Sequence, residues 1–444
     1  MKINMPDEAK TIIEVLNNAG YEAYIVGGCV RDSILGRNPS DWDITTSAKP
    51  EEVKKLFRRT VDTGVKHGTV TVLIKGNAYE VTTFRIDGEY TDHRRPEGVT
   101  YTSELSEDLL RRDFTINAMA YSDKTGLVDL YGGVEDLDKG IIRCVGVPDE
   151  RFDEDALRIM RAVRFAAQLG FEIDEETRKA ASGHAEELKL ISAERIETEL
   201  TKLLLSDHPE RIIDMYELGI TAVILPEFDT IMETEQNTPY HLYDVGRHTI
   251  EVIKNVSPTK VMRYAALFHD MGKPHCRTTD EKGRDHFKGH AVKSEEIAGH
   301  IMKRLRMDNN TIRDVKKIVY WHDYGISGTI SKKSVRRMLS KMGPEYFDSY
   351  VEIKKADMKG QSDYRIEERT KVFENIIMFH DEIISKGDAL SIKELALNGK
   401  DLQEMGIKAG PKMGQILNSL MEKVLENPEI NNKDELKKLV DQFK

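Results

Sequence analysis

The chain has 444 residues, of which 39% are hydrophobic and 32% charged, and its formal net charge is −11 at pH 7. This length predicts two to four domains with sizeable hydrophobic cores. The negative charge excludes a protein that coats nucleic acid indiscriminately, because binding to many phosphates requires an excess of Lys and Arg. Any site for RNA must therefore be local.

The cysteines Cys29, Cys144 and Cys276 lie far apart in the sequence and form no CxxC pair. They predict reduced thiols rather than a disulfide framework or a zinc–thiolate site. No apolar run is long enough to cross a bilayer, and the first residues are typical of an amphipathic helix rather than a secretory signal. We therefore expect a cytoplasmic protein without a membrane partner.

The chain changes character near Val147. Before it, helical stretches alternate with short β-rich runs at residues 21–26, 41–46, 68–74, 79–85 and 141–146, which predicts an α/β domain at residues 1–147. After it, apolar residues recur at three- and four-residue spacing, which predicts an almost entirely helical remainder. Breaks in this pattern predict three further domains at residues 148–225, 226–386 and 387–444.

Acidic residues of the first domain predict a metal site. Asp41 and Asp43 are placed at the start of the second expected strand, where period-two geometry points both carboxylates to one face. An isolated pair of this kind is more often a solvated turn, but two like charges held together are costly unless a cation neutralises them. Glu80 would add a third oxygen ligand if its strand lies beside the first. This ligand set is typical of two-metal phosphoryl transfer with Mg²⁺.

The Gly27-Gly28 pair precedes a helical stretch, and such a junction can present backbone N–H groups to a triphosphate. The run GGCVRDSILGRNPSDWDIT, which starts at Gly27, resembles the signature of the class II tRNA nucleotidyltransferase and bacterial poly(A) polymerase family. The resemblance continues through the blocks EVTTFR, DGEYTDHRRP, RRDFTINAM, DLYGGVEDL and RFDEDALRIMRAVRF, and covers the second half of the chain more loosely.

This resemblance implies an α/β polymerase-β-like nucleotidyltransferase head followed by an all-α neck, body and tail. It implies two Mg²⁺ ions in the head, with Asp41, Asp43 and Glu80 as catalytic residues. The implied reaction is addition of CMP, CMP and AMP, from CTP and ATP, to the 3′ end of tRNA. Poly(A) synthesis or addition of the terminal A alone are the closest rivals, because they share the same blocks.

Glu154, Asp155 and Arg158 are predicted to share one helix, with Asp155 and Arg158 on the same side. By itself this pattern is typical of an intrahelical ion pair. A carboxylate acceptor beside a guanidinium donor also matches the exocyclic amine and ring nitrogen of cytosine and adenine, whereas uracil and guanine present the reverse. The resemblance implies that Asp155 and Arg158 replace a template base.

The block RRDFTINAM is predicted to be helical, and its Arg side chains suit phosphate oxygens while Asp or Asn can bond a ribose 2′-hydroxyl. A helix face with charge pairs is the alternative. The resemblance implies nucleotide contacts from this block and its neighbours, and the full expected set is Gly27, Gly28, Arg31, Arg111, Arg112, Asp113, Asn117, Glu154, Asp155, Arg158, Arg161 and Arg164. The segment Asp87–Pro96 resembles the family's flexible loop, which favours an enzyme able to incorporate AMP.

The third predicted domain carries residues in the order H…HD…H…D, which resembles the metal-binding pattern of the HD superfamily. The residues are His248, His269, Asp270, His290 and Asp357. His322 is a further candidate ligand, and imidazole with carboxylate suits a transition metal or Mg²⁺. The resemblance implies an HD-type body with a divalent metal. Some family members use such a domain as a phosphohydrolase and others keep only its fold. The ligand set looks complete here, so hydrolysis of phosphate esters, with 2′,3′-cyclic phosphate at RNA ends as a candidate substrate, is a candidate second activity.

Two basic segments are candidates for local RNA contact, Ser331–Lys341 and Lys408–Lys412, with a solvated helix face as the alternative for each. The second lies in residues 398–417, which resemble the family's RNA-contacting tail. A function of a different class is an HD phosphohydrolase with an inactive head. The presence of Asp41, Asp43 and Glu80 argues against that alternative.

Overall fold

The computed structural model describes residues 2–87, 99–325 and 330–442. The chain divides into two compact units, Met1–Thr230 with Ile301–Met307, and Ile231–His300 with Asp308–Lys444. No helix in the described ranges is both long and apolar enough to span a membrane. The expected loop at Asp87–Pro96 lies outside the described residues from position 88 onward, so it stays a prediction.

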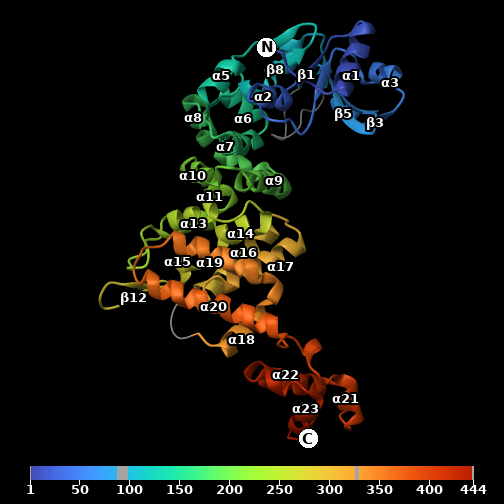
Figure 1. Cartoon of the computed structure of the whole chain (residues 1–444). Helices are drawn as coiled ribbons and strands as arrows, with labels where there is room; N and C mark the ends of the chain where they lie inside the picture. Colours follow the sequence, from blue (N-terminus) through green and yellow to red (C-terminus); the bar gives the residue numbers. More distant parts are fainter. Residues whose placement is uncertain (1, 88–98, 326–329, 443–444) are drawn as a thin grey trace. The chain divides into compact units, whose positions relative to one another are not determined.

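A mixed sheet with the strand order β3-β4-β5-β2-β1-β8-β9 forms the centre of the head (Figure 1). Its strands are β1 (Ala23–Val26), β2 (Ile44–Thr46), β3 (Thr60–Gly64), β4 (Thr69–Ile74), β5 (Asn77–Thr83), β8 (Met119–Ser122) and β9 (Gly126–Asp129). β2 and β5 are parallel, whereas the other neighbouring strands are antiparallel. The parallel pair places two chain segments that are distant in sequence side by side.

The helices of the head surround this sheet. They are α1 (Asp7–Asn18), α2 (Gly28–Ile34), α3 (Pro50–Leu56), α4 (Leu105–Leu110) and α5 (Gly133–Lys139), and a separate two-stranded ribbon comprises β6 (Arg85–Asp87) and β7 (Val99–Tyr101). In one core cluster, Tyr24 of β1 and Phe84, which follows β5, pack with Leu109 of α4. All three side chains are buried, so the sheet and α4 form one rigid support.

The α/β character of residues 1–147 is confirmed, with three local corrections. β2 begins at Ile44, so Asp41 and Asp43 precede the strand rather than lie in it. The block Arg111–Met119 is not helical: α4 ends at Leu110, a 3₁₀ turn covers Thr115–Asn117, and β8 begins at Met119. The reason is local, because the Asp113 carboxylate accepts a hydrogen bond from the backbone N–H of Phe114, which fixes a turn at this position. The last expected strand is reduced to β10 (Ile141–Ile142).

The remainder of the first unit is helical, as predicted. Its helices are α6 (Pro148–Glu154), α7 (Leu157–Leu169), α8 (Glu175–Gly183), α9 (Ala193–Leu204), α10 (Ile212–Glu217) and α11 (Ile220–Ile224), and β11 (Glu172–Ile173) pairs with β10. α7 is buried on most of its circumference and packs against α9. It ends at Leu169, before Gly170, whose φ of 71° favours glycine. α7 is therefore a central support of this unit.

The expected single helix around Asp155 is interrupted. α6 ends at Glu154, and Asp155 has an extended backbone with φ −148° and ψ 100°, before α7 begins at Leu157. The Asp155 side chain accepts a hydrogen bond from the Leu157 backbone N–H at 3.1 Å, so it satisfies a donor at the start of α7. Asp155 and Arg158 are thus not one turn apart on a continuous helix.

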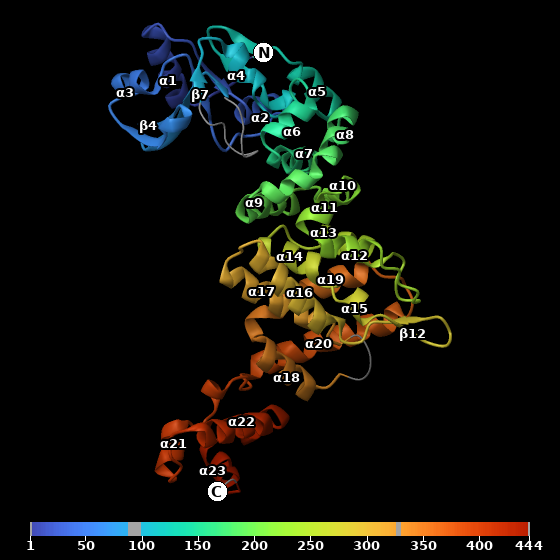
Figure 2. The ribbon, with the colours of Figure 1, turned by 180° about the vertical axis from the view of Figure 1, so that it is seen from behind.

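The second unit is a helical assembly (Figure 2). Its helices are α13 (Val245–Lys254), α14 (Lys260–Phe268), α15 (Lys273–Cys276), α16 (His290–Arg304, ending in the first unit), α17 (Asn309–Trp321), α18 (Lys332–Met342), α19 (Phe347–Lys359), α20 (Ile366–Lys386), α21 (Gly399–Glu404), α22 (Pro411–Glu426) and α23 (Lys433–Asp441), with α12 (Pro226–Met232) at the junction of the two units. α13, α14, α17 and α19 pack against one another. Asp244, Thr259 and Asp308 cap the N-termini of α13, α14 and α17 with side-chain oxygens.

Candidate functional site

The acidic group of the head forms where β2 and β5 run in parallel. Ile44 pairs with Val81, so Asp43, which precedes Ile44, lies beside Glu80, which precedes Val81. Burial raises the pKa of Asp43, and repulsion from Glu80 and Asp41 raises it further, while Arg112 lowers it. Although Asp43 retains surface exposure, the neighbouring carboxylates make its ionised form costly. Oxygen ligands crowded in this way are suited to a divalent cation.

Gly27 brings the turn before α2 against the side chain of Arg112. Its φ is 80°, and a Cβ at this position would lie 2.9 Å from Nη1 of Arg112. Arg112 is also within 3.6 Å of Asp108, a fully buried carboxylate on α4. Burial lowers the pKa of Arg112, and the charge of Asp108 opposes that effect. The Gly27-Gly28 turn and the Asp43 carboxylate therefore both lie near the Arg112 guanidinium.

Asp108 is a residue that the sequence analysis missed. Its carboxylate accepts a hydrogen bond from Arg111 at 2.6 Å and one from the Thr45 hydroxyl at 3.0 Å. The spacing of Asp108 from Arg111 and Arg112, three and four residues, would have indicated this pairing. Asp108 positions two of the expected nucleotide-binding arginines.

A hydrogen-bonded chain connects Arg31, Asn117, Asp113 and Arg161. Arg31 donates to the Asn117 side-chain oxygen at 2.7 Å, and the Asn117 amide donates to Asp113 at 3.1 Å. Arg161 on α7 donates to the other Asp113 oxygen at 2.8 Å and 2.5 Å. Four of the expected nucleotide-binding residues therefore form one network, which runs from Arg31 on α2 to Arg161 on α7.

The expected Asp155–Arg158 side-chain pair is not formed. Arg158 donates to Glu154 at 2.5 Å and to the backbone carbonyl of Arg111 at 2.9 Å. Asp155 accepts instead from Arg195 on α9 at 2.7 Å. The physical reason is the break between α6 and α7, which separates the two side chains. Arg195 is a second residue that the sequence analysis missed, since it lies 40 residues beyond Asp155.

Arg164 differs from the other expected nucleotide-binding residues because it is held in a buried ion pair. Its Nε lies 2.8 Å from Glu199, and the two side chains are only 7% and 5% exposed. The guanidinium also sits 3.5 Å from the ring centroid of Phe165. These contacts give Arg164 a packing role between α7 and α9.

The body gathers its four expected and candidate histidines around Asp270. The ring Nδ1 atoms of His269, His290 and His322 lie 2.7, 2.8 and 2.6 Å from the backbone carbonyls of Ala266, Phe287 and Val319. The Nδ1 of His248 lies 3.2 Å from the carbonyl of Gly360. A neutral imidazole that donates from Nδ1 has a free lone pair on Nε2, which is the tautomer that metal ligands adopt.

These rings and Asp270 form two groups that could each hold a metal ion, His248 with His269 and Asp270, and Asp270 with His290 and His322. All five residues are buried. Asp357 lies 3.0 Å from Nε2 of His248, a member of the first group. Burial lowers the pKa of His269 and His290, but the charge of Asp270 outweighs burial and raises the pKa of both.

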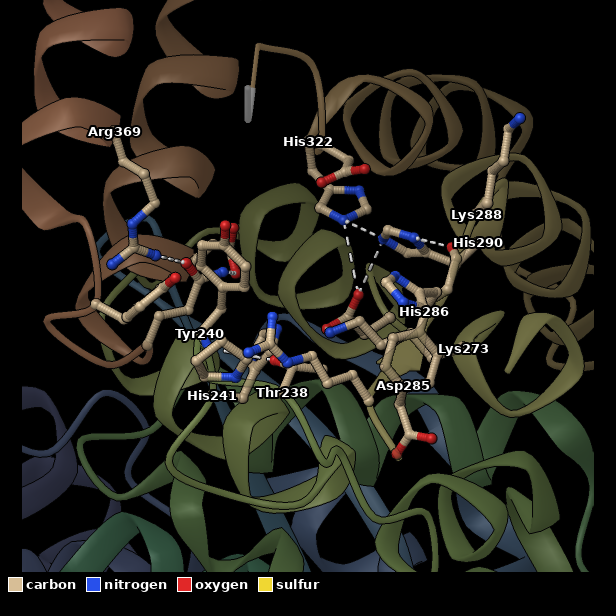
Figure 3. Close-up of a pocket in the computed structure, with 18 residues that line it drawn as sticks. Thr238, Tyr240, His241, Lys273, Asp285, His286, Lys288, His290, His322 and Arg369 are labelled. Carbon is tan, nitrogen blue, oxygen red and sulfur yellow. Dashed lines mark hydrogen bonds and ion pairs between the residues drawn. The ribbon is translucent and has the colours of Figure 1, made fainter. Parts of the chain in front are cut away.

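Asp270, His290 and His322 of this cluster line a cavity of about 550 Å³, within the size range of small-molecule sites (Figure 3). The rings of His290 and His322 turn toward each other at one side of this cavity. Lys273 reaches the same place and lies 2.7 Å from Asp270, while Arg284 and Lys288 also line the cavity. Cations around an opening of this size suit an anionic ligand.

The two basic segments differ in their surroundings. In α18 the basic side chains are paired with acidic residues of the same unit: Lys332 with Glu382, Lys333 with Glu426, Arg336 with Asp388 and Arg337 with Glu422. This segment therefore offers little uncompensated positive charge. Lys408 and Lys412 are exposed and line a shallow cavity of about 540 Å³ before α22. The tail segment retains the exposed charge that a phosphate contact requires.

Comparison with known families covers most of the chain. Residues 23–143 match the poly A polymerase head domain model, and residues 170–232 match the model for the RNA- and SrmB-binding site of polymerase A. Residues 289–440 match the model for tRNA nucleotidyltransferase domain 2. The HD-type nature of the body is a separate prediction, which rests on the side-chain geometry of that unit.

Individual relatives agree with these matches. The CCA-adding enzyme of Levilactobacillus brevis is 36% identical over 98% of both chains. The enzyme of the same name from Lactiplantibacillus plantarum is 57% identical over 45% of this chain and 49% of its own. The crystal structure of the Bacillus stearothermophilus CCA-adding enzyme in complex with CTP is 30% identical, covers 99% of this chain and 98% of its own, and gives a TM-score of 0.71. The chain belongs to the CCA-adding enzyme family of nucleotidyltransferases.

Proposed function

We propose that this protein adds CMP, CMP and AMP, from CTP and ATP, to the 3′ end of tRNA in the cytoplasm. The observation that carries the proposal is the acidic group of the head, in which Asp41 and Glu80 repel the Asp43 carboxylate beside Arg112. Two Mg²⁺ ions fit these oxygen ligands and would supply activation of the attacking hydroxyl and neutralisation of the triphosphate. In this proposal Asp41, Asp43 and Glu80 are the metal-binding, catalytic residues.

The nucleotide would lie between the Gly27-Gly28 turn and α7. The Gly27-Gly28 turn and Arg112 face the phosphates in this proposal, while Asp113 and Asn117 are available to the ribose. Arg31, Arg111 and Arg161 hold this surface in place through the contacts described above, and Glu154 and Arg164 orient their neighbours on α6 and α7.

Selection of the base is assigned to Asp155 and Arg158. In the structure these side chains bond to Arg195 and Glu154. For both of them to reach one base edge, they must exchange those partners for the nucleotide. We propose that this exchange accompanies nucleotide binding.

We also propose that Lys408 and Lys412 of the tail contact tRNA phosphates.

The experiment that tests the function is incubation of tRNA ending in the discriminator base with CTP, with ATP, and with both. Addition of two residues with CTP alone and of three with both nucleotides is expected. Addition of a single A, or of a long A tract, would replace the proposal with the A-adding or poly(A) alternative. Absence of any addition would favour an inactive head.

A second function is favoured by the body, where four imidazole Nε2 atoms face Asp270. We propose that this centre binds a divalent metal and hydrolyses phosphate esters, including 2′,3′-cyclic phosphates. Replacement of His269 and Asp270 by Ala is expected to remove hydrolysis without stopping tRNA extension, because the acidic group of the head contains neither residue. Loss of extension in a variant with unchanged circular dichroism and Tm would show that the two activities are not separable.

A further inference from the structure

A second cavity of the body, of about 570 Å³, lies where α17 meets α16 and α18. It shares no lining residue with the cavity beside Asp270, and its volume is within the size range of small-molecule sites. Four of its nine lining residues are basic and only Glu295 is acidic. The cavity is therefore locally positive in a chain whose net charge is −11.

Two of the four cations lack a counter-charge. Lys317 Nζ donates a hydrogen bond to the backbone carbonyl of Lys341 at 2.8 Å, and neither lysine forms an ion pair within the residues that the structure describes. Lys316 differs, because its Nζ lies 3.0 Å from a Glu295 oxygen on α16. The excess positive charge is therefore concentrated at Lys317 and Lys341, where α17 approaches the end of α18.

Two adjacent aromatic side chains complete the cavity. Tyr320 is 43% exposed, whereas Trp321 is partly buried against the hydrophobic core of the body. Their ring centroids are 5.2 Å apart and the ring planes meet at 67°, so the two rings are not stacked on each other. An exposed aromatic ring beside lysines is a platform on which a planar base can stack.

This combination suits one nucleoside phosphate rather than a strand of RNA. The base would stack on the ring while the phosphate meets the ammonium groups. A strand requires cations that continue along its path. The other basic side chains of α18 do not extend the positive surface, because each is paired with an acidic residue: Lys332, Lys333, Arg336 and Arg337.

We propose that this cavity is an accessory binding site for a single nucleoside phosphate. The base stacks on Tyr320, and Lys317 and Lys341 bind the phosphate, with the exposed guanidinium of Arg313 as a further donor. None of the lining residues belongs to the first unit, so the site is separate from the nucleotide site proposed for the head. Because basic side chains supply the positive charge, binding requires no divalent cation.

The chain contains a local reporter for the test, because Trp42 and Trp321 are its only tryptophans. The fluorescence of Trp42→Phe therefore reports on Trp321 alone. Titration is made in EDTA, which removes the divalent cations that the sites proposed for the head and for Asp270 require. AMP is expected to change the fluorescence saturably, with a Kd of about 1 mM or lower. Adenosine and ribose 5-phosphate, which each lack one half of the ligand, should bind at least about tenfold more weakly.

Variants made in the Trp42→Phe background locate the site. Tyr320→Leu should weaken AMP binding roughly 5- to 100-fold, because it removes the stacking surface and keeps an apolar side chain. Lys317→Gln should weaken it about tenfold. Tyr243→Leu and Lys355→Gln are the matched controls, since each changes an exposed residue of the same unit outside the cavity. These controls, and Arg284→Ala in the cavity beside Asp270, should leave the titration unchanged.

A folded Trp42→Phe protein whose fluorescence does not respond to AMP would overturn the proposal, and so would equal AMP binding in Tyr320→Leu. A response to oligoadenylate without a response to AMP would replace the nucleotide with an RNA strand. A response to polyglutamate alone would replace it with an acidic protein segment. If Trp42→Phe does not fold, equilibrium dialysis of AMP against the parent and against Tyr320→Leu decides the question, because equal binding by the two would overturn the site.

Discussion

Arg161 donates two hydrogen bonds to one oxygen of Asp113, from Nε at 2.8 Å and from Nη2 at 2.5 Å, and so ties α7 to the turn that follows α4. Burial alone would raise the pKa of the Asp113 carboxyl, but Arg161 and the Asn117 amide outweigh it and hold that pKa below its usual value. Asp113 is therefore ionised whenever the unit is folded at neutral pH.

This pair predicts a pH dependence of stability. Because the folded pKa of Asp113 is lowered, its stabilising contribution is present above the unfolded pKa of about 3.9 and is lost as the pH falls through the folded pKa. We expect the Tm to fall progressively as the pH drops below about 4 toward the folded pKa, and to fall less in Asp113→Asn. Asp62→Asn, which changes a largely exposed carboxylate on β3 that pairs with Lys54 of α3, is the control and should follow the parent profile. Equal slopes in all three proteins would contradict the prediction.

Replacement of Asp41 or Asp43 by Ala is expected to abolish nucleotide addition and preserve the fold. Each change removes a proposed metal ligand, while both residues retain surface exposure and lie outside the sheet. The measurement is extension of tRNA lacking CCA, with circular dichroism as the test of folding. Asp62→Ala alters another exposed carboxylate of the head and should remain active. Addition of C and A by either variant at the parent rate in Mg²⁺ would refute the assignment.

Arg158→Ala and Asp155→Ala are expected to weaken discrimination between CTP and UTP. An unmatched buried polar group costs about 1–3 kcal/mol, so selectivity should fall by roughly one to two orders of magnitude. Steady-state kcat/KM for all four nucleotides measures the effect.

Arg195→Ala serves as a comparison, since it removes the partner of Asp155 and leaves Asp155 itself. A smaller change is expected from it, because Asp155 can still meet the base. If the Asp155 and Arg158 variants exclude UTP and GTP as sharply as the parent, the base is selected by other residues.

Glu199→Ala should destabilise the first unit. The change leaves Arg164 buried without its counter-charge, which costs about 3–5 kcal/mol. Glu194→Ala is the matched control on the same helix, since its pair with Arg306 is exposed and should contribute less than about 1 kcal/mol. Denaturant unfolding measures both, and equal midpoints for the two variants would show that the buried pair does not contribute as expected.

The sequence determined the local features of this protein. Three features could be recognised in the sequence, because each depends on neighbouring residues or on a continuous motif. They are the Gly27-Gly28 turn, the spacing of Asp41 and Asp43, and the order of histidines in the body. The change from β-rich to helical periodicity near Val147 likewise placed the end of the α/β region. Periodicity failed at Asp155 and at Arg111–Met119, where side chains that bond to the backbone interrupt the helix.

Only the tertiary structure decided which partners meet. The pairing of β2 with β5 places Asp43 beside Glu80. The packing of α7 against α9 brings Arg195 within hydrogen-bonding distance of Asp155, and Glu199 within that distance of Arg164. The packing of the body also decides that Oδ2 of Asp270 faces His248 and His269 while Oδ1 faces His290 and His322, which no sequence pattern shows. Spacing along a chain fixes which face of an element a side chain occupies, whereas the choice of a distant partner depends on how the elements pack.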